Sequence, residues 1–244
     1  MALLRVWLRM TSEPKYFFGT SYAIFFRASS RNVFQKHVAF QITLGINDDI
    51  HVLDKDNREY NGRSILIKSL VKSKILCDGP FIHLFLSPTL NLTSDLITVA
   101  GEDDIHILQN AEQLPINITT SPNEIIADLN AMDKASYGSL DPRLVAALEY
   151  LDQNLDNPSI LDAAKRSGLS RSRVRTLARE QIGIPLSTWV TWRKLVKANK
   201  ALSDGANLSD AALAGHFADQ AHLSRTMKRM FGVTLTQAFQ AYTE

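Results

Sequence analysis

The sequence lacks several features on which common classes of protein depend. Cys77 is the single cysteine among 244 residues, so no intramolecular disulfide can form and the usual cysteine spacings of metal sites are excluded. No run of about 18 uncharged apolar residues occurs. The first ten residues, MALLRVWLRM, include two arginines and are not followed by a small-residue cleavage pattern. We therefore expect a cytoplasmic protein without a membrane span.

The motifs of several enzyme classes are also absent. The sequence has no glycine pattern typical of phosphate or dinucleotide binding and no Gly-x-Ser-x-Gly motif. The histidines of the first half stand apart from one another, at His37, His51, His83 and His106, with no His-x-His pair. Cys77 precedes Asp78, and nothing nearby would lower its pKa, so a structural role is expected. We predict no catalytic residue and no metal site, and we leave any cofactor unknown.

The two halves of the chain differ in charge. The net charge of +2 combines 13 basic and 15 acidic residues in 1–136 with 14 basic and 10 acidic residues in 137–244. Between Lys165 and Lys200, ten basic residues stand against one acidic residue, Glu180. A solvated helix face would also account for such residues. Their concentration nevertheless favours an anionic partner for the second half.

Short apolar runs separated by turn residues are typical of the first half. In VAFQITLGI, residues 38–46, apolar residues alternate with others, which is the period of a strand with one buried face. SILIKSLV at 64–71 and FIHLFL at 81–86 are two more candidate strands, bounded by turn residues such as Asp78-Gly79-Pro80. This pattern predicts a small β-barrel or sandwich.

An aromatic cluster stands near the start of this region. Its members are Tyr16, Phe17, Phe18, Tyr22, Phe25 and Phe26. Such residues fill the core of a barrel or a strand edge, and the alternative is that they line a pocket for an apolar ligand.

A helix is predicted at 122–132. Ser121 is a candidate N-cap, Pro122 suits the first helical position, and Glu124 follows the cap by three residues. Ile125, Ile126 and Leu129 share one stripe. We expect that stripe to pack in a dimer or domain interface.

The second half reads as helical throughout. Asp141 and Pro142 open a helix whose apolar stripe contains Leu144, Leu148, Leu151 and Leu155. Further helices are expected to begin at Ser159, Ser170, Pro185, Ser209, Asp219 and Thr234. The expected ends lie near Gly168, Gly183, Gly205, Phe217 and Gly232.

Two segments of this region repeat with a register of 49 residues. The matched pairs are Ser170 with Asp219, Val174 with Leu223, Arg179 with Lys228, Ile182 with Phe231, Gly183 with Gly232 and Ile184 with Val233. Each copy is a short helix, a tight turn and a second helix, which is the plan of a helix-turn-helix unit.

The helix expected from Pro185 to Ser203 would join the two units. It would be about 28 Å long at 1.5 Å per residue, and successive major grooves on one side of B-DNA are about 34 Å apart. We expect Trp189, Trp192 and Leu195 to supply apolar surface to both units. The basic residues left for solvent or phosphates are Arg193, Lys194, Lys197 and Lys200.

Residues from about Leu140 to Gln240 resemble the AraC/XylS family of bacterial transcription regulators. The strongest part of the resemblance is FADQAHLSRTMKRMFGVTLTQAF, at 217–239. The chain departs from the family pattern at four positions, with His216 for a glycine, Met227 for a phenylalanine, Leu235 for a proline and Gln240 for an arginine. These departures concern packing and helix starts.

The resemblance implies an α+β protein of two domains. Residues 1–120 would form a cupin-like β-barrel with a sensory or dimerising role, and 121–139 a linker helix and linker. Residues 140–244 would form an all-α domain with two helix-turn-helix units joined by a long helix.

The resemblance also implies which residues meet DNA. Base contacts are expected from Ser172, Arg175 and Thr176 in the first unit and from Gln220, His222 and Arg225 in the second. Arg171, Arg173, Arg179 and Lys228 would lie nearer the DNA backbone, while Val174, Leu177, Leu223 and Phe231 would face the core. Arginine can pair with guanine and glutamine with adenine through two hydrogen bonds.

The leading interpretation is a sequence-specific DNA-binding transcription regulator, with activation as the expected outcome, associated with the bacterial nucleoid. A small-molecule effector in the barrel, contact with RNA polymerase and a homodimer through the N-terminal domain or linker helix are open expectations. The alternatives are an architectural DNA-binding protein without sequence preference and a barrel enzyme with an accessory DNA-binding domain.

Overall fold

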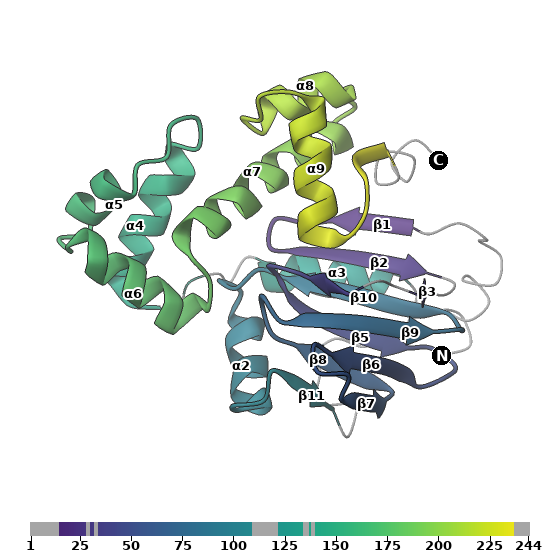
Figure 1. Cartoon of the computed structure of the whole chain (residues 1–244). Helices are drawn as coiled ribbons and strands as arrows, with labels where there is room; N and C mark the ends of the chain where they lie inside the picture. Colours follow the sequence, from purple (N-terminus) through teal and green to yellow (C-terminus); the bar gives the residue numbers. More distant parts are fainter. Residues whose placement is uncertain are drawn as a thin grey trace.

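The protein consists of a sheet-rich N-terminal domain and a helical C-terminal domain (Figure 1). The computed structural model describes residues 15–27, 30–31, 34–108, 122–133, 137 and 140–236. The first ten residues, Ser121 and Gln240, to which the sequence assigned roles, lie outside the described residues. The expected division into a strand-rich first half and a helical second half is confirmed.

Six strands form the larger sheet of the N-terminal domain, in the order β1-β2-β10-β5-β8-β11. All neighbouring strands in it are antiparallel. Their bounds are β1 Lys15–Phe18, β2 Tyr22–Arg27, β5 Phe40–Gly45, β8 Ser64–Ile67, β10 Phe81–Leu86 and β11 Ile105–Ile107.

A smaller sheet has the order β3-β9-β6-β7, with β4 also paired to β9. Its strands are β3 Ser30–Arg31, β4 Gln35–Lys36, β6 Ile50–Asp54, β7 Glu59–Gly62 and β9 Lys72–Cys77. Within the described residues the two sheets are not joined by strand pairing into a closed barrel. The strands therefore form two separate sheets, and the closed, cupin-like barrel expected from the resemblance is not confirmed.

Both faces of the central strand β5 are buried, whereas its alternating pattern predicted one buried face. Ile42 and Leu44 share an apolar cluster with Leu96 of α2 (Asn91–Ala100) and with Ile125 and Leu129 of α3 (Pro122–Asp133). The opposite face of β5 presents polar side chains that are also buried. The one-face prediction was wrong because helices cover one side of the sheet and other parts of the fold cover the second.

The helix predicted at 122–132 is present as α3, but its apolar stripe was wrongly assigned to an interface. Ile125 and Leu129 are almost fully buried against the larger sheet of the same chain. Tyr22 Oη of β2 donates a hydrogen bond of 2.9 Å to Asn130 Oδ1. The stripe is thus part of the N-terminal core.

Four of the six residues in the aromatic cluster near the start of the chain fill the core, as expected, whereas Phe17 and Phe18 are half-buried. Tyr16, Tyr22, Phe25 and Phe26 are buried in β1 and β2. Cys77 is also buried, and its Sγ donates to the Gly79 carbonyl at 3.2 Å. Burial raises the pKa of the Cys77 thiol, which agrees with a structural rather than a nucleophilic role.

Six helices make up the described part of the C-terminal domain. They are α4 Pro142–Gln153, α5 Ile160–Arg166, α6 Arg171–Ile182, α7 Leu186–Ser203, α8 Leu208–Ala214 and α9 Gln220–Phe231. Asp141, Ser159, Ser170 and Asp219 cap α4, α5, α6 and α9 through their side chains, as predicted. Of the helix predicted at Thr234, the structure describes only Leu235 and Thr236, and both are helical.

The start predicted for α8 was wrong. Asn207 rather than Ser209 caps this helix, because Asn207 Oδ1 accepts hydrogen bonds from the backbone N–H groups of Ser209 and Asp210. The helix also ends earlier than predicted, at Ala214 instead of near Phe217.

Aromatic rings join the two domains at the C-terminal end of α9. The Phe231 ring lies 5.7 Å from Phe18, 5.9 Å from Phe25 and 5.5 Å from Phe85, measured between ring centroids. The same ring lies 5.5 Å from Trp192 of α7. In Figure 1 this end of α9 meets the sheet beside β1 and β2. Helix α9 of the C-terminal domain is therefore anchored in the core of the N-terminal domain.

A hydrogen bond accompanies this aromatic contact. His37 Nδ1 lies 3.1 Å from the Met230 carbonyl oxygen, the geometry of an imidazole N–H donating to that oxygen. Burial lowers the pKa of His37 to about 4, and the backbone hydrogen bond opposes that shift. His37 is therefore neutral at pH 7.

Candidate nucleic-acid interface

Helix α6 presents a basic face to solvent. Ser170 Oγ accepts a hydrogen bond of 3.1 Å from the Arg173 backbone N–H and so fixes the start of the helix. The core side is made by Val174, Leu177, Ala178 and Ile182. All six candidate contacts of this helix are exposed: Arg171, Ser172, Arg173, Arg175, Thr176 and Arg179.

Helix α9 repeats that design. Asp219 Oδ1 accepts a hydrogen bond of 2.6 Å from the His222 backbone N–H, and Leu223 and Phe231 face the core as predicted. The four candidate contacts Gln220, His222, Arg225 and Lys228 are exposed.

Both helices end on a glycine in the left-handed conformation. Gly183 follows α6 with φ 68°, and Gly232 follows α9 with φ 74°. Only glycine adopts such angles without strain, so the two units close in the same way.

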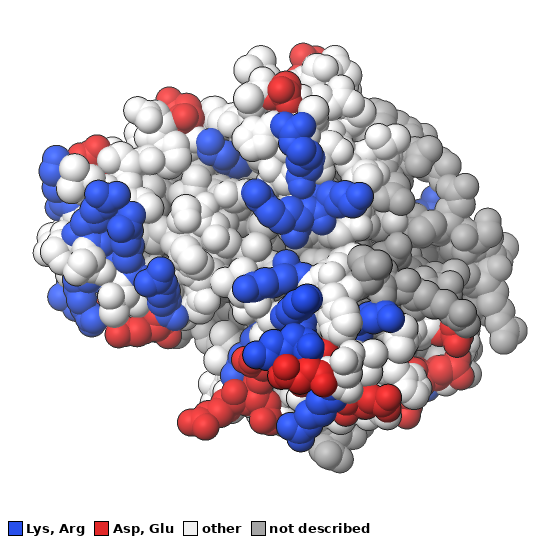
Figure 2. All heavy atoms as spheres, viewed as in Figure 1, with Lys and Arg blue, Asp and Glu red and all other residues white. Residues whose placement is uncertain are grey.

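The candidate contacts contribute to a positively charged surface. Figure 2 shows Lys and Arg side chains over α5 and α6 on the left and over α9 and the adjoining sheet in the centre. Arg173 Nη1 and Glu180 Oε2 form an exposed ion pair of 3.4 Å, so part of the charge on α6 is balanced. The surface as a whole suits the phosphate backbone of nucleic acid.

Helix α7 joins the two units but offers fewer cations than expected. Trp189, Trp192 and Leu195 are buried, as predicted. Arg193, however, pairs with Asp152 of α4, with Nε 2.6 Å from Oδ1 and Nη2 3.0 Å from Oδ2. The expectation that Arg193 faces solvent or phosphates was wrong, because its guanidinium clamps α7 to α4.

The other three cations of α7 have different surroundings. Lys194 Nζ donates to the His216 carbonyl at 3.3 Å. Lys200 forms an exposed ion pair of 2.9 Å with Asp204. Lys197 is exposed.

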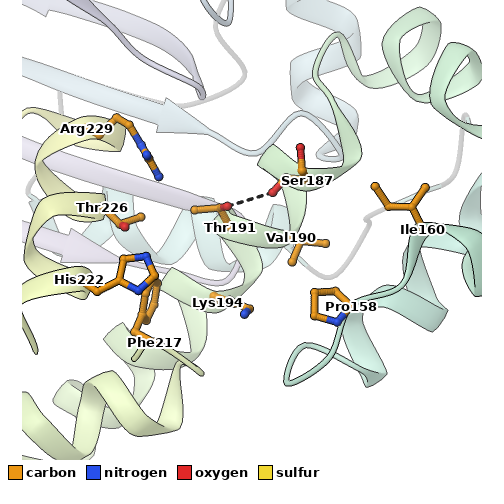
Figure 3. Close-up of a pocket in the computed structure, with 10 residues that line it drawn as sticks. All are labelled: Pro158, Ile160, Ser187, Val190, Thr191, Lys194, Phe217, His222, Thr226 and Arg229. Carbon is orange, nitrogen blue, oxygen red and sulfur yellow. Dashed lines mark hydrogen bonds between the residues drawn. The ribbon is translucent and has the colours of Figure 1, made fainter. Parts of the chain in front are cut away.

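A cavity of about 270 Å³ lies between the two helix-turn-helix units. Figure 3 shows α7 crossing its floor, α9 on one side and the α4–α5 loop on the other. His222 is among its lining residues, and the His222 ring packs edge-to-face on Phe217 at 5.3 Å. A residue expected to read bases therefore also borders a cavity.

Sequence reasoning missed a buried polar cluster inside the sheet-rich domain. Thr43 Oγ1 lies 3.0 Å from His83 Nδ1, and Gln41 Nε2 lies 3.2 Å from the same nitrogen. The alternation of β5 marked Gln41 and Thr43 as polar, but a pattern in one strand does not reveal that a second layer covers them. Within the described ranges, no three His, Cys, Asp or Glu residues lie close enough to hold a metal ion.

Among all the residues that the structure describes, no helix is long and apolar enough to cross a membrane.

Sequence comparisons match the helical domain. A family described as a helix-turn-helix domain matches residues 163–241. The HTH-type transcriptional regulator YkgA of Escherichia coli strain K12 is 37% identical over 87 residues. That alignment spans 35% of this chain and 36% of the relative, about a third of each protein.

Structural comparisons match nearly the whole chain. An apo variant of ToxT from Vibrio cholerae has a TM-score of 0.59 at 10% identity, over 92% of this chain and 98% of that chain. Wild-type ToxT with a bound unsaturated fatty acid has a TM-score of 0.56 at 12% identity, over 91% of this chain and 95% of that chain. This chain and ToxT share the two-domain fold.

Proposed function

We propose, from the premise that the C-terminal domain of this chain is an AraC-type double helix-turn-helix domain, that the protein is a sequence-specific transcription regulator. It would place α6 and α9 in successive major grooves of one DNA duplex. The observation that carries this proposal is the repeated design of the two helices. Each has a side-chain N-cap, a buried apolar side, exposed polar and basic residues in its first turns and a left-handed glycine at its end.

Specific roles follow from position on the helices. Ser172, Arg175 and Thr176 would read bases in one groove, and Gln220, His222 and Arg225 would read them in the next. Arg171, Arg173, Arg179 and Lys228 would contact phosphates, which position the protein without specifying the sequence. All ten side chains are exposed, as contact with DNA requires.

The N-terminal domain would supply control, through a small-molecule effector or self-association. Its anchoring to α9 through Phe231 gives such a signal a physical path to one of the two units. ToxT, which shares the fold, has been solved with a bound unsaturated fatty acid. Activation through contact with RNA polymerase is the expected regulatory outcome.

Fluorescence anisotropy of the full chain tests the proposal. Binding sites are first selected from random DNA. The selected DNA, the DNA upstream of the protein's own gene and scrambled DNA of the same composition are then titrated at two salt concentrations. We expect the upstream or selected DNA to bind at least about a thousandfold more tightly than scrambled DNA. Equal affinities with a steep salt dependence would instead establish the architectural alternative.

A further inference from the structure

The cavity between the two helix-turn-helix units has an apolar floor. Val190 of α7 and Phe217 are buried there, and Ile160 of α5 and Pro158 of the preceding loop face them from the other side. Because α5 belongs to the first unit and Phe217 to the second, the cavity has one wall in each unit (Figure 3). A molecule bound in it would contact both.

The rim of this cavity is cationic. Lys194 of α7 and Arg229 of α9 line it, together with His222, and none of the ten lining residues is acidic. In Figure 3 the Arg229 side chain extends from α9 toward the cavity. Lys194 donates one hydrogen bond, to the His216 carbonyl, and an ammonium group has three donors.

Hydroxyl groups complete the lining. Ser187 and Thr191 lie one turn apart on α7, and Thr191 Oγ1 donates to the Ser187 carbonyl at 2.9 Å. Thr226 of α9 is buried at the opposite wall. The lining thus has the composition of a ligand site, with a largely apolar surface and a few polar groups that can orient one end of a ligand.

We propose that this cavity binds a small amphipathic anion, of the class of aromatic carboxylates, with its apolar body on Val190, Phe217 and Ile160 and its carboxylate at the cationic rim beside Lys194. The cavity volume of about 270 Å³ suits one or two fused rings rather than a long chain. The apolar floor argues against a bare inorganic anion, which would remain better solvated in water.

The electrostatics of Lys194 agree with this assignment. Burial lowers the pKa of Lys194, and the charge of Asp156 opposes that shift. A partly buried cation that lacks a carboxylate partner at hydrogen-bond distance gains from an anion that enters beside it. Lys197, one turn along the same helix, is exposed and does not line the cavity.

Binding there would oppose DNA binding, and this step rests on the proposed function. His222 lies in the first turn of α9, where base contacts are proposed, and Arg229 lies on the same side of that helix two turns later. An anion would neutralise the cationic rim and lie beside His222, in the first turn of α9. By linkage, DNA must then weaken the anion to the same degree that the anion weakens DNA.

The first experiment measures ligand binding to the full chain by isothermal titration. The probes are 2-naphthoate and its neutral analogue 2-naphthamide, which has the same ring system and no charge. We expect 2-naphthoate to bind at least about tenfold more tightly than the amide, because charge-assisted hydrogen bonds are the stronger ones. Equal affinities, or no saturable binding of 2-naphthoate up to millimolar concentration, would overturn the proposal.

Variants locate the site. Lys194→Met removes the charge and keeps the apolar stem, and we expect it to weaken 2-naphthoate about tenfold. Its matched control, Lys197→Met, should leave the affinity within about twofold. Ser187→Trp places a large ring over the cavity from an exposed position and should abolish binding while the circular dichroism spectrum stays unchanged. If Lys194→Met and Ser187→Trp both bind 2-naphthoate like the unaltered protein, the site lies elsewhere and the inference is wrong.

A competition experiment tests the link to DNA. We expect saturating 2-naphthoate to lower the affinity of the full chain for its selected DNA about tenfold, and to have no effect on the Lys194→Met variant. Undiminished DNA affinity at saturation would refute the antagonism. A chain that binds no DNA without the probe would refute the proposed function instead, while the titrations of 2-naphthoate would still decide whether the site exists.

Discussion

The two helix-turn-helix units share one local design but rest on different supports. The second unit is fixed to the sheet-rich domain by Phe231, whose ring contacts three aromatic rings of β1, β2 and β10. The first unit faces that domain across a cavity of about 230 Å³, which separates the end of α6 at 180–183 from residues such as Phe40 and Pro88. A signal in the N-terminal domain can therefore reach α9 by direct aromatic packing, whereas the end of α6 borders that domain across a cavity.

The largest expected effect contrasts the matched residues Phe231 and Ile182. Phe231→Ala should lower the free energy of unfolding by about 3–5 kcal/mol, and Ile182→Ala by about 2–5 kcal/mol, because both are buried. Denaturant unfolding measures these values. Hydrogen exchange should show faster exchange in β1 and β2 only for Phe231→Ala. Equal exchange in both variants would mean that the second unit is not anchored as described.

Acid should destabilise the fold through His37, which contacts the second unit at Met230. The pKa of His37 falls from 6.5 to about 4 in the folded protein, so the unfolded chain takes up the proton more readily. Neutral His37 makes its full contribution to the free energy of unfolding above about pH 6.5. As pH falls toward 4, the free energy of unfolding decreases by up to about 1.4 kcal/mol per pH unit. Thermal unfolding of the protein and of His37→Gln at several pH values measures this.

His37→Gln keeps a donor for the Met230 carbonyl and removes the titration. We therefore expect its unfolding temperature to fall less steeply between pH 6.5 and 4 than that of the unaltered chain. Parallel curves for the two proteins would contradict the role given to His37.

The two units should contribute separable shares of DNA specificity. Arg175→Ala and Arg225→Ala should each cost about 1–3 kcal/mol and relax base choice at one position, in different parts of the binding site. Arg179→Ala and Lys228→Ala should weaken all sequences about equally and reduce the salt slope by about one. Anisotropy against a panel of single-base variants distinguishes these outcomes. If Arg175→Ala weakens specific and scrambled DNA by the same factor, its base-reading role is wrong.

The smallest effect concerns the end of each reading helix, where the units are alike. Gly183→Ala and Gly232→Ala should each cost about 1–2 kcal/mol, because alanine is strained at positive φ. A Cβ at Gly183 meets open space, whereas at Gly232 it would approach Gln35 Oε1, the movable end of a side chain. We expect denaturant unfolding to give a slightly larger cost at Gly232, and Gln35→Ala to remove that excess. A much larger cost at Gly232 that persists in Gln35→Ala would mean that the two ends are not alike.

The helical domain was largely predictable because its signals are local. Ser170, Asp219 and the glycines at 183 and 232 fix helix ends through their own hydrogen bonds and backbone angles, which the sequence shows directly. The start of α8 was misplaced because Asn207 and Ser209 are both good caps, and only the observed hydrogen bonds decide between them.

Long-range features of the fold could not be predicted in the same way. The partner of Arg193 is Asp152, 41 positions away in the sequence, and His37 meets a backbone carbonyl at Met230. The apolar stripe of α3 showed that the helix is buried on one side but not which surface covers it. The candidate DNA contacts are all exposed on α6 and α9, as expected, and their roles remain predictions.

The central claim is that one chain reads two successive grooves with two units held by α7. A binding site is selected from random DNA with the full chain. Five base pairs are then inserted between the segment read by α6 and the segment read by α9, which turns one segment to the opposite side of the duplex. We predict that the insertion lowers affinity to that of a single segment, whereas an insertion of ten base pairs at an outer edge of the site has no effect. Unchanged affinity after the five-base-pair insertion would contradict the claim.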